Sequence, residues 1–233
     1  MLTDYLLRHG YTFFASGWMQ FAAAFGLSFL IMLIFGRPFI RAMRAWQKKG
    51  QPISENVPTQ HLKKAGTPTM GGILLLVAII IPSILFMPMH NPTGWIALLA
   101  LALFGLIGFA DDFKKVTSQS KKAANGLSPL MRLTLEGVCV VALAYLINRT
   151  MPPYIPEWSL ALPFGIILPL GLFYFVFAYF VICGSANATN ITDGLDGMLA
   201  KLYLPVLIVL VVALYGATRI GFMDTVMFLP TAS

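Results

Sequence analysis

Six long apolar runs constrain this chain more than any other feature of its sequence. A helix needs about 20 consecutive apolar residues to cross the hydrocarbon core of a bilayer, and about 17 to 25 are tolerated. Runs of this kind, with few or no charges, occupy residues 18–35, 71–89, 93–110, 133–148, 160–183 and 202–218. They predict an all-α polytopic membrane protein with about six transmembrane helices. No internal repeat or shift in composition marks a boundary, so we expect a single transmembrane domain over residues 1–233.

The composition excludes an ordinary soluble domain. Charged residues make up 11% of the chain, whereas soluble domains have about 25%. The first residues lack a positively charged stretch followed directly by an apolar core and a cleavage site, so we expect no cleavable signal peptide. Cys139 and Cys183 both fall within the apolar runs. We interpret them as small hydrophobic residues and expect neither a disulfide nor a zinc site.

The basic residues gather on one side of the predicted membrane. Of the 16 Lys and Arg residues, 13 lie in segments 37–64 and 111–132 or at Lys201. The remaining ones are Arg8, Arg149 and Arg219. Because loops rich in Lys and Arg stay in the cytoplasm, this asymmetry predicts an outer N-terminus and inner loops at the basic segments. Membrane topology therefore explains the net charge of +7, and we expect no nucleic-acid partner.

Polar segments occur at the inner ends of three apolar runs. The first, HLKKAGTPTMGG at residues 61–72, precedes the second run. Adjacent lysines, threonine hydroxyls and a Gly-Gly pair suit a phosphate-bearing ligand, because glycine lets the backbone approach a ligand closely. The alternative is that Lys63 and Lys64 only set the topology and that Pro68 begins a helix.

The second polar segment is FADDFKKV at residues 109–116. Acidic residues near hydrocarbon depth are rare unless they are paired or functional. In a helix, Asp111 and Lys115 share a face while Asp112 points about 100° away, so we expect Lys115 to pair with Asp111 and to leave Asp112 free. Adjacent carboxylates suit Mg²⁺ or a general base. The alternative is a solvated helix end with one salt bridge.

The third polar segment is NATNITDGLDGM at residues 187–198, which we interpret as a loop between two spans. Its amide and carboxylate residues recur at every third position, which aligns them on a 3₁₀ turn or spreads them over half of an α-helix. Amides suit a base or sugar, and carboxylates suit a ribose or a metal-bound diphosphate. The alternative is a loop that only turns the chain. The residues concerned are Asn187, Asn190, Asp193 and Asp196.

Two further residues carry weaker signals. Glu136 lies one turn after Arg132, so we expect the two side chains to pair. His61 lies in a basic loop and is interpreted as an exposed residue that could also titrate near neutral pH.

Taken together and in this order, HLKKAGTPTMGG, DDFKK and NATNITDGLDG closely resemble the motifs of the MraY family, the phospho-N-acetylmuramoyl-pentapeptide transferases. The resemblance implies an enzyme of peptidoglycan synthesis, and hence of cell wall biogenesis, cell shape and cell division, in the bacterial cytoplasmic (inner) membrane. Such an enzyme uses Mg²⁺ to move phospho-N-acetylmuramoyl-pentapeptide from UDP to undecaprenyl phosphate on the cytoplasmic face. The products are lipid I and UMP. The resemblance also suggests a homodimer.

The resemblance assigns roles only at matching positions. It implies catalysis by Asp111 and Asp112, of which the first matches the aspartate proposed to deprotonate the lipid phosphate. It implies substrate binding by Lys64, Thr69, Lys115, Asn187, Asn190, Asp193 and Asp196.

The sequence also departs from the family pattern. Family members have further spans and an FMGD-type motif whose aspartate binds Mg²⁺. Asp224 in GFMDT lacks the preceding glycine and falls on the outer side of the predicted membrane, so the metal ligand stays unassigned. Arg132 stands where the family carries a lysine, a change that keeps charge but not geometry. Because the diphosphate charge would then lack its metal, we expect the isolated 233-residue chain to show little or no transferase activity.

Other functions stay open at this point. One is a related transferase that acts on UDP-N-acetylhexosamine, and another is an inactive, truncated chain. A transporter with ion-carrying Asp111 and Asp112 would place carboxylates near the bilayer midplane, whereas these lie at the inner end of a run. Direct attack by the lipid phosphate and a covalent intermediate are both compatible with the sequence.

Overall fold

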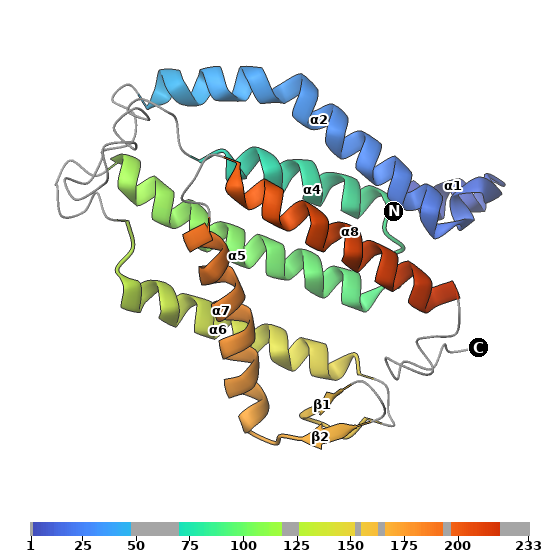
Figure 1. Ribbon diagram of the computed structural model, residues 1–233. Helices are drawn as coiled ribbons and strands as arrows, with labels where there is room; N and C mark the ends of the chain where they lie inside the picture. The colour runs from blue at the N-terminus through green and yellow to red at the C-terminus, as the bar shows by residue number, and fades with distance from the viewer. Residues whose placement is uncertain are drawn as a thin grey trace. The chain divides into compact units, whose positions relative to one another are not determined.

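The structure is a computed structural model in which the described residues are 2–47, 70–117, 126–151, 155–162, 166–192 and 197–219. Figure 1 shows that most of them form helices, together with one small β-hairpin. The chain divides into two compact units, residues 1–139 and 140–233, and each is described by itself. The expected single domain stays a prediction.

Long apolar helices confirm the predicted class of all-α polytopic membrane protein. Among the described residues, three helices have the length and composition to cross a membrane, namely α2 (Gly17–Trp46), α5 (Pro92–Thr117) and α6 (Pro129–Arg149). Two further helices contain shorter apolar stretches at the second and sixth predicted spans: α4 (Gly72–Phe86), and α8 (Met198–Arg219), whose apolar stretch is Met198–Val212.

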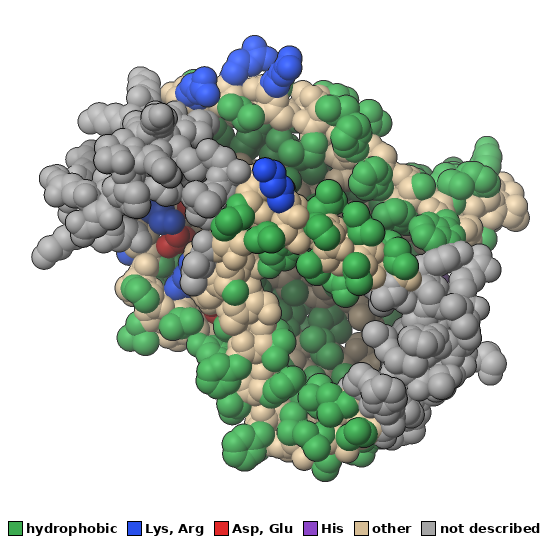
Figure 2. Space-filling model, in the orientation of Figure 1, with side chains coloured by type: hydrophobic (Ala, Val, Ile, Leu, Met, Phe, Trp, Pro, Cys, Tyr) green, Lys and Arg blue, Asp and Glu red, His purple; other side chains and the backbone are tan. Residues whose placement is uncertain are grey.

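Helix α2 is longer than a membrane crossing requires. Its 30 residues correspond to about 45 Å at 1.5 Å per residue, whereas the hydrocarbon core is about 30 Å thick. The last turns carry Arg37, Arg41 and Arg44. Figure 2 shows Lys and Arg side chains over this end of α2, while apolar side chains cover much of the drawn face. The helix therefore continues past its apolar part into the basic segment.

In the first unit, α4 packs against both α2 and α5. The short helix α1 (Leu2–Arg8) also contacts α4, because Thr3 Oγ1 donates a 2.8 Å hydrogen bond to the carbonyl of Phe86. Between α4 and α5, a side chain at Gly105 would meet Leu76, with the added Cβ 2.6 Å from Leu76 Cδ1. The glycine thus allows the two helices to approach closely, as small residues do between membrane helices. The 3₁₀ turn η1 (Thr12–Ala15) connects α1 to α2.

The second unit corrects the predicted span over 160–183. Strand β1 (Ser159–Ala161) pairs antiparallel with β2 (Ile167–Pro169), and Leu160 lies opposite Leu168. Helix α7 begins only at Phe173 and runs to Thr192 (Phe173–Thr192). Trp158 packs against Phe175, with ring centroids 4.9 Å apart, and so joins the hairpin to the start of α7. The apolar run is therefore divided between a hairpin and a helix.

The polar end of α7 is helical, and its hydroxyl side chains bond to the helix backbone. Ser185, Thr189 and Thr192 each donate to the carbonyl four residues earlier, at 2.6 to 2.8 Å. Such bonds give the hydroxyl groups partners within the helix. The expectation of a loop from residue 187 onward is therefore wrong as far as Thr192.

Candidate functional site

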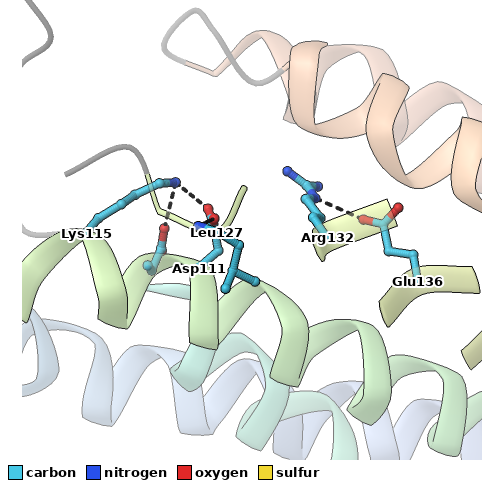
Figure 3. Close-up of polar contacts among 6 residues, drawn as sticks. Asp111, Lys115, Leu127, Arg132 and Glu136 are labelled. Atoms are coloured by element: carbon cyan, nitrogen blue, oxygen red, sulfur yellow. Dashed lines mark hydrogen bonds and ion pairs between the residues drawn. The ribbon is translucent and has the colours of Figure 1, made fainter. Parts of the chain in front are cut away.

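The second polar segment forms the best defined cluster of charged side chains. Asp111, Asp112 and Lys115 lie near the C-terminal end of α5, within the first unit. The Lys115 Nζ atom lies 2.5 Å from Asp111 Oδ2 and 3.4 Å from Asp112 Oδ1 (Figure 3). The expected pair of Asp111 and Lys115 is confirmed. The expectation that Asp112 stays free is wrong, because a flexible lysine reaches carboxylates both three and four residues earlier.

Asp111 is held by a second donor that sequence analysis missed. The backbone N–H of Leu127 donates a 2.7 Å hydrogen bond to Asp111 Oδ1. Both oxygens of Asp111 therefore accept from donors, and its side chain is 14% exposed, compared with 31% for Asp112. The Asp112 carboxylate is thus the more accessible of the two. Because every residue except proline carries a backbone N–H, no residue type marks such a donor in the sequence. The glycine that precedes Leu127 was the only sequence signal at this position.

Gly126 lies directly against this cluster. It has a φ of 76°, in the left-handed region that favours glycine. A Cβ added there would contact Asp111 Oδ1 and would lie 2.9 Å from both Asp111 Cγ and Lys115 Cε. The close fit requires a residue without a side chain at this position.

The predicted pair of Arg132 and Glu136 is confirmed in the first turns of α6. Arg132 Nε donates to Glu136 Oε1 at 2.9 Å. The Glu136 side chain is 2% exposed and that of Arg132 is 25% exposed. A carboxylate buried this deeply needs a charged partner. Glu136 therefore holds the guanidinium of Arg132, which remains partly accessible. Figure 3 shows this pair together with the α5 cluster.

The third polar segment contributes residues to the second unit. Asn187 and Asn190 lie in the last turns of α7, where residues three apart are neighbours on one face. Asn187 is half-buried and donates from Nδ2 to the carbonyl of Cys183 at 2.8 Å, whereas Asn190 is exposed. The α-helical arrangement is therefore the one adopted by these two residues.

Several candidate residues lie outside the described residues. Their proposed roles in substrate binding stay predictions. The residues with these roles are Lys64, Thr69, Asp193 and Asp196. His61, which was interpreted as an exposed residue, also lies outside the described residues.

The described residues do not form a magnesium site by themselves. Within the described ranges, no group of three or more His, Cys, Asp or Glu side chains gathers in a way that could hold a metal ion. Magnesium takes oxygen ligands in near-octahedral geometry, and both oxygens of Asp111 already accept from Lys115 or Leu127.

Comparison with known proteins finds two family matches in this chain. Residues 94–233 match the model of glycosyl transferase family 4, and this range includes α5 with both aspartates. Residues 64–76 match signature 1 of the phospho-N-acetylmuramoyl-pentapeptide transferases. Together the two matches overlap all three polar segments: the signature overlaps the first, and the family model includes the second and the third.

Curated relatives are named phospho-N-acetylmuramoyl-pentapeptide-transferase. A Ruegeria pomeroyi protein is 41% identical over 215 residues, which cover 91% of this chain and 57% of the relative. A protein of Ruegeria sp. strain TM1040 is 38% identical over 218 residues, with the same two coverages of 91% and 57%. A Bartonella quintana protein is 40% identical over 178 residues, which cover 76% of this chain and 48% of the relative. The chain thus spans roughly half the length of these relatives.

Proposed function

This chain belongs to glycosyl transferase family 4, and we propose that it acts in the transfer of phospho-N-acetylmuramoyl-pentapeptide from UDP to undecaprenyl phosphate, giving lipid I and UMP. The match of residues 64–76 to the transferase signature supports this substrate within the family. The names of the relatives support the same choice. The reaction would serve peptidoglycan synthesis, and through it cell shape and division.

The observation that carries the proposal is the position of Lys115 between two carboxylates at the end of α5. Transfer between two phosphates is accelerated by positioning the reactants and by stabilising charge. The Lys115 ammonium would hold a phosphate oxygen of the lipid acceptor or of the diphosphate. The resemblance gives the removal of the lipid phosphate proton to Asp111, but Asp112 is the more exposed carboxylate and is better suited to accept that proton. Asp111, with both oxygens occupied by donors, would orient Lys115.

The other parts of the site are proposed from the resemblance. Mg²⁺ would neutralise the diphosphate when bound, through ligands that the described residues do not supply. The nucleotide would bind to Lys64 and Thr69 and to the polar segment at the end of α7. That segment contributes Asn187, Asn190, Asp193 and Asp196.

The location of the cluster fits a lipid acceptor. Asp111 and Lys115 follow the apolar part of α5 directly, on the basic side of the predicted membrane. Because basic segments face the cytoplasm, we place the active site on the cytoplasmic face of the inner membrane. There the phosphate of a polyprenyl chain stays at headgroup level while its chain remains in the bilayer. A homodimer is part of this proposal.

Release of UMP tests the proposed function. The complete product of the gene is purified in detergent and mixed with UDP-N-acetylmuramoyl-pentapeptide, undecaprenyl phosphate and Mg²⁺. We expect UMP release that requires all three and is lost in Asp112→Asn. Release with UDP-N-acetylglucosamine but not with the muramoyl-pentapeptide nucleotide would instead establish the related hexosamine transferase. Absence of release with either nucleotide would contradict the proposal.

A further inference from the structure

We propose that Gly126 and the backbone N–H of Leu127 form a clamp that positions Asp111, and through Lys115 also Asp112. We call these two residues the Gly126–Leu127 clamp. Its role in turnover rests on the proposed function, but the contact itself does not. All of these residues belong to the first unit.

A chain of polar contacts links Leu127 to Asp112 through Asp111 and Lys115. Leu127 N–H donates to Asp111 Oδ1 at 2.7 Å, the short distance typical of a hydrogen bond to a charged acceptor. The other oxygen of Asp111 lies 2.5 Å from Lys115 Nζ, which in turn lies 3.4 Å from Asp112 Oδ1. Two donors at fixed directions define the rotation of the Asp111 carboxylate. A shift of Asp111 would therefore move Lys115 relative to Asp112.

The position of Gly126 has no room for a side chain. Its positive φ of 76° already disfavours any residue with a Cβ. Independently of φ, the added Cβ would contact Asp111 Oδ1 and would lie 2.9 Å from Lys115 Cε. These are two groups of the proposed catalytic cluster, rather than unrelated packing atoms. A side chain at this position would push both groups away from their observed positions.

The chain offers a matched control for backbone strain. Gly10 has a φ of 88°, and an added Cβ there would meet no atom within 4 Å. Gly10→Ala therefore introduces the strain of a positive φ without a clash, whereas Gly126→Ala introduces both. The difference between the two variants isolates the contact with Asp111 and Lys115.

Thermal unfolding tests the contact without any need for activity. Gly126→Ala and Gly10→Ala are each made in the wild-type protein and in Asp111→Ala, and the four decreases in Tm are compared. Asp111→Ala removes the side chain that the new Cβ would strike. We expect the decrease in Tm caused by Gly126→Ala to be at most about half as large in the Asp111→Ala background, because the stability effects of substitutions at contacting residues are not additive. The decrease caused by Gly10→Ala should be the same in both backgrounds.

Turnover then tests the positioning role. UMP release is measured on the complete gene product and divided by the fraction of molecules that bind the nucleotide, so that unfolded protein is not counted. We expect Gly126→Ala to lower kcat by about tenfold or more, because small misplacements of reacting groups can cost about 10²-fold. The KM for the nucleotide should stay within about twofold. Gly10→Ala should keep both values.

Each contrary result has a distinct meaning. Equal decreases in Tm for Gly126→Ala in both backgrounds would overturn the contact. Unequal decreases together with an unchanged kcat would overturn the positioning role. If the wild-type protein releases no UMP, the proposed function and the positioning role both fail, and the unfolding data still decide whether the contact exists.

Discussion

Lys115 is the residue that turns two adjacent aspartates into one cluster. Its ammonium contacts both Asp111 and Asp112, so the charge of either carboxylate is partly compensated at the end of an apolar helix. The expectation paired Lys115 with Asp111 alone and missed the contact with Asp112, although residues three apart are also neighbours on a helix. The donor from Leu127 could not be predicted, since every residue except proline carries a backbone N–H.

Replacing Lys115 should reduce turnover far more than replacing its neighbour. Lys115→Gln removes the ammonium between the carboxylates, and we expect kcat for UMP release to fall by about 10²-fold, as for loss of one charge-stabilising donor. Lys114→Gln is the control, because Lys114 is exposed and carries the same charge. Kinetics of both purified variants provide the measurement. Equal losses in the two variants would show that only the net charge of this segment matters.

Glu136 should stabilise the folded protein because its buried carboxylate pairs with Arg132. Glu136→Ala leaves Arg132 without its partner, and breaking a buried pair costs about 3–5 kcal/mol. Because Arg132 is 25% exposed and water can solvate it, we expect a loss near the lower end of that range. Glu157→Ala, which removes an exposed carboxylate, should change stability little. Chemical denaturation in detergent measures both variants, and a similar small effect in each would contradict the buried role.

At the scale of elements, the length of the apolar runs predicted the positions of helices well and the ends of those helices less well. The predicted spans at 18–35, 93–110 and 133–148 all lie within longer helices. The span at 160–183 was wrong, because length and hydropathy do not separate a hairpin from a helix when both are apolar. Length and hydropathy also failed to predict the helical end of α7, where hydroxyl side chains bond to the helix backbone.

Packing of α4 against α5 depends on the absence of a side chain at Gly105. Gly105→Leu would drive new atoms into Leu76, and overpacking of this kind costs about 1–3 kcal/mol. Gly108→Leu lies three residues later on the same helix, where an added Cβ would meet no atom within 4 Å. We therefore expect a lower Tm for Gly105→Leu and little change for Gly108→Leu. A thermal melt of each variant decides the matter, and equal Tm values would refute the close approach.

At the scale of the whole molecule, the charge asymmetry predicts an orientation in the membrane. The basic end of α2 and the α5 cluster belong to the side rich in Lys and Arg, while α1 belongs to the opposite side. The site prediction depends on this arrangement, because the proposed substrates would meet at the cytoplasmic face. The order of the sequence motifs along the chain and their side of the membrane could be predicted in this way.

Cysteine labelling tests the orientation directly. Tyr11→Cys and Arg44→Cys, both at exposed positions, are each placed in a protein whose Cys139 and Cys183 are replaced by alanine. A membrane-impermeant maleimide should label the cysteine at position 11 in intact spheroplasts, and the one at position 44 only after permeabilisation. The reverse pattern would place the α5 cluster outside the cytoplasm and contradict the proposed function.

The most direct test of the central claim is the identity of the lipid product. Membranes that contain the complete gene product are incubated with UDP-N-acetylmuramoyl-pentapeptide, undecaprenyl phosphate and Mg²⁺, and the extracted lipids are analysed by mass spectrometry. We predict a product in which muramoyl-pentapeptide is joined to undecaprenol through a diphosphate, and we predict its loss in Asp112→Asn. If the wild-type and Asp112→Asn membranes form equal amounts of this lipid, or if neither forms any, the proposed transferase function is contradicted.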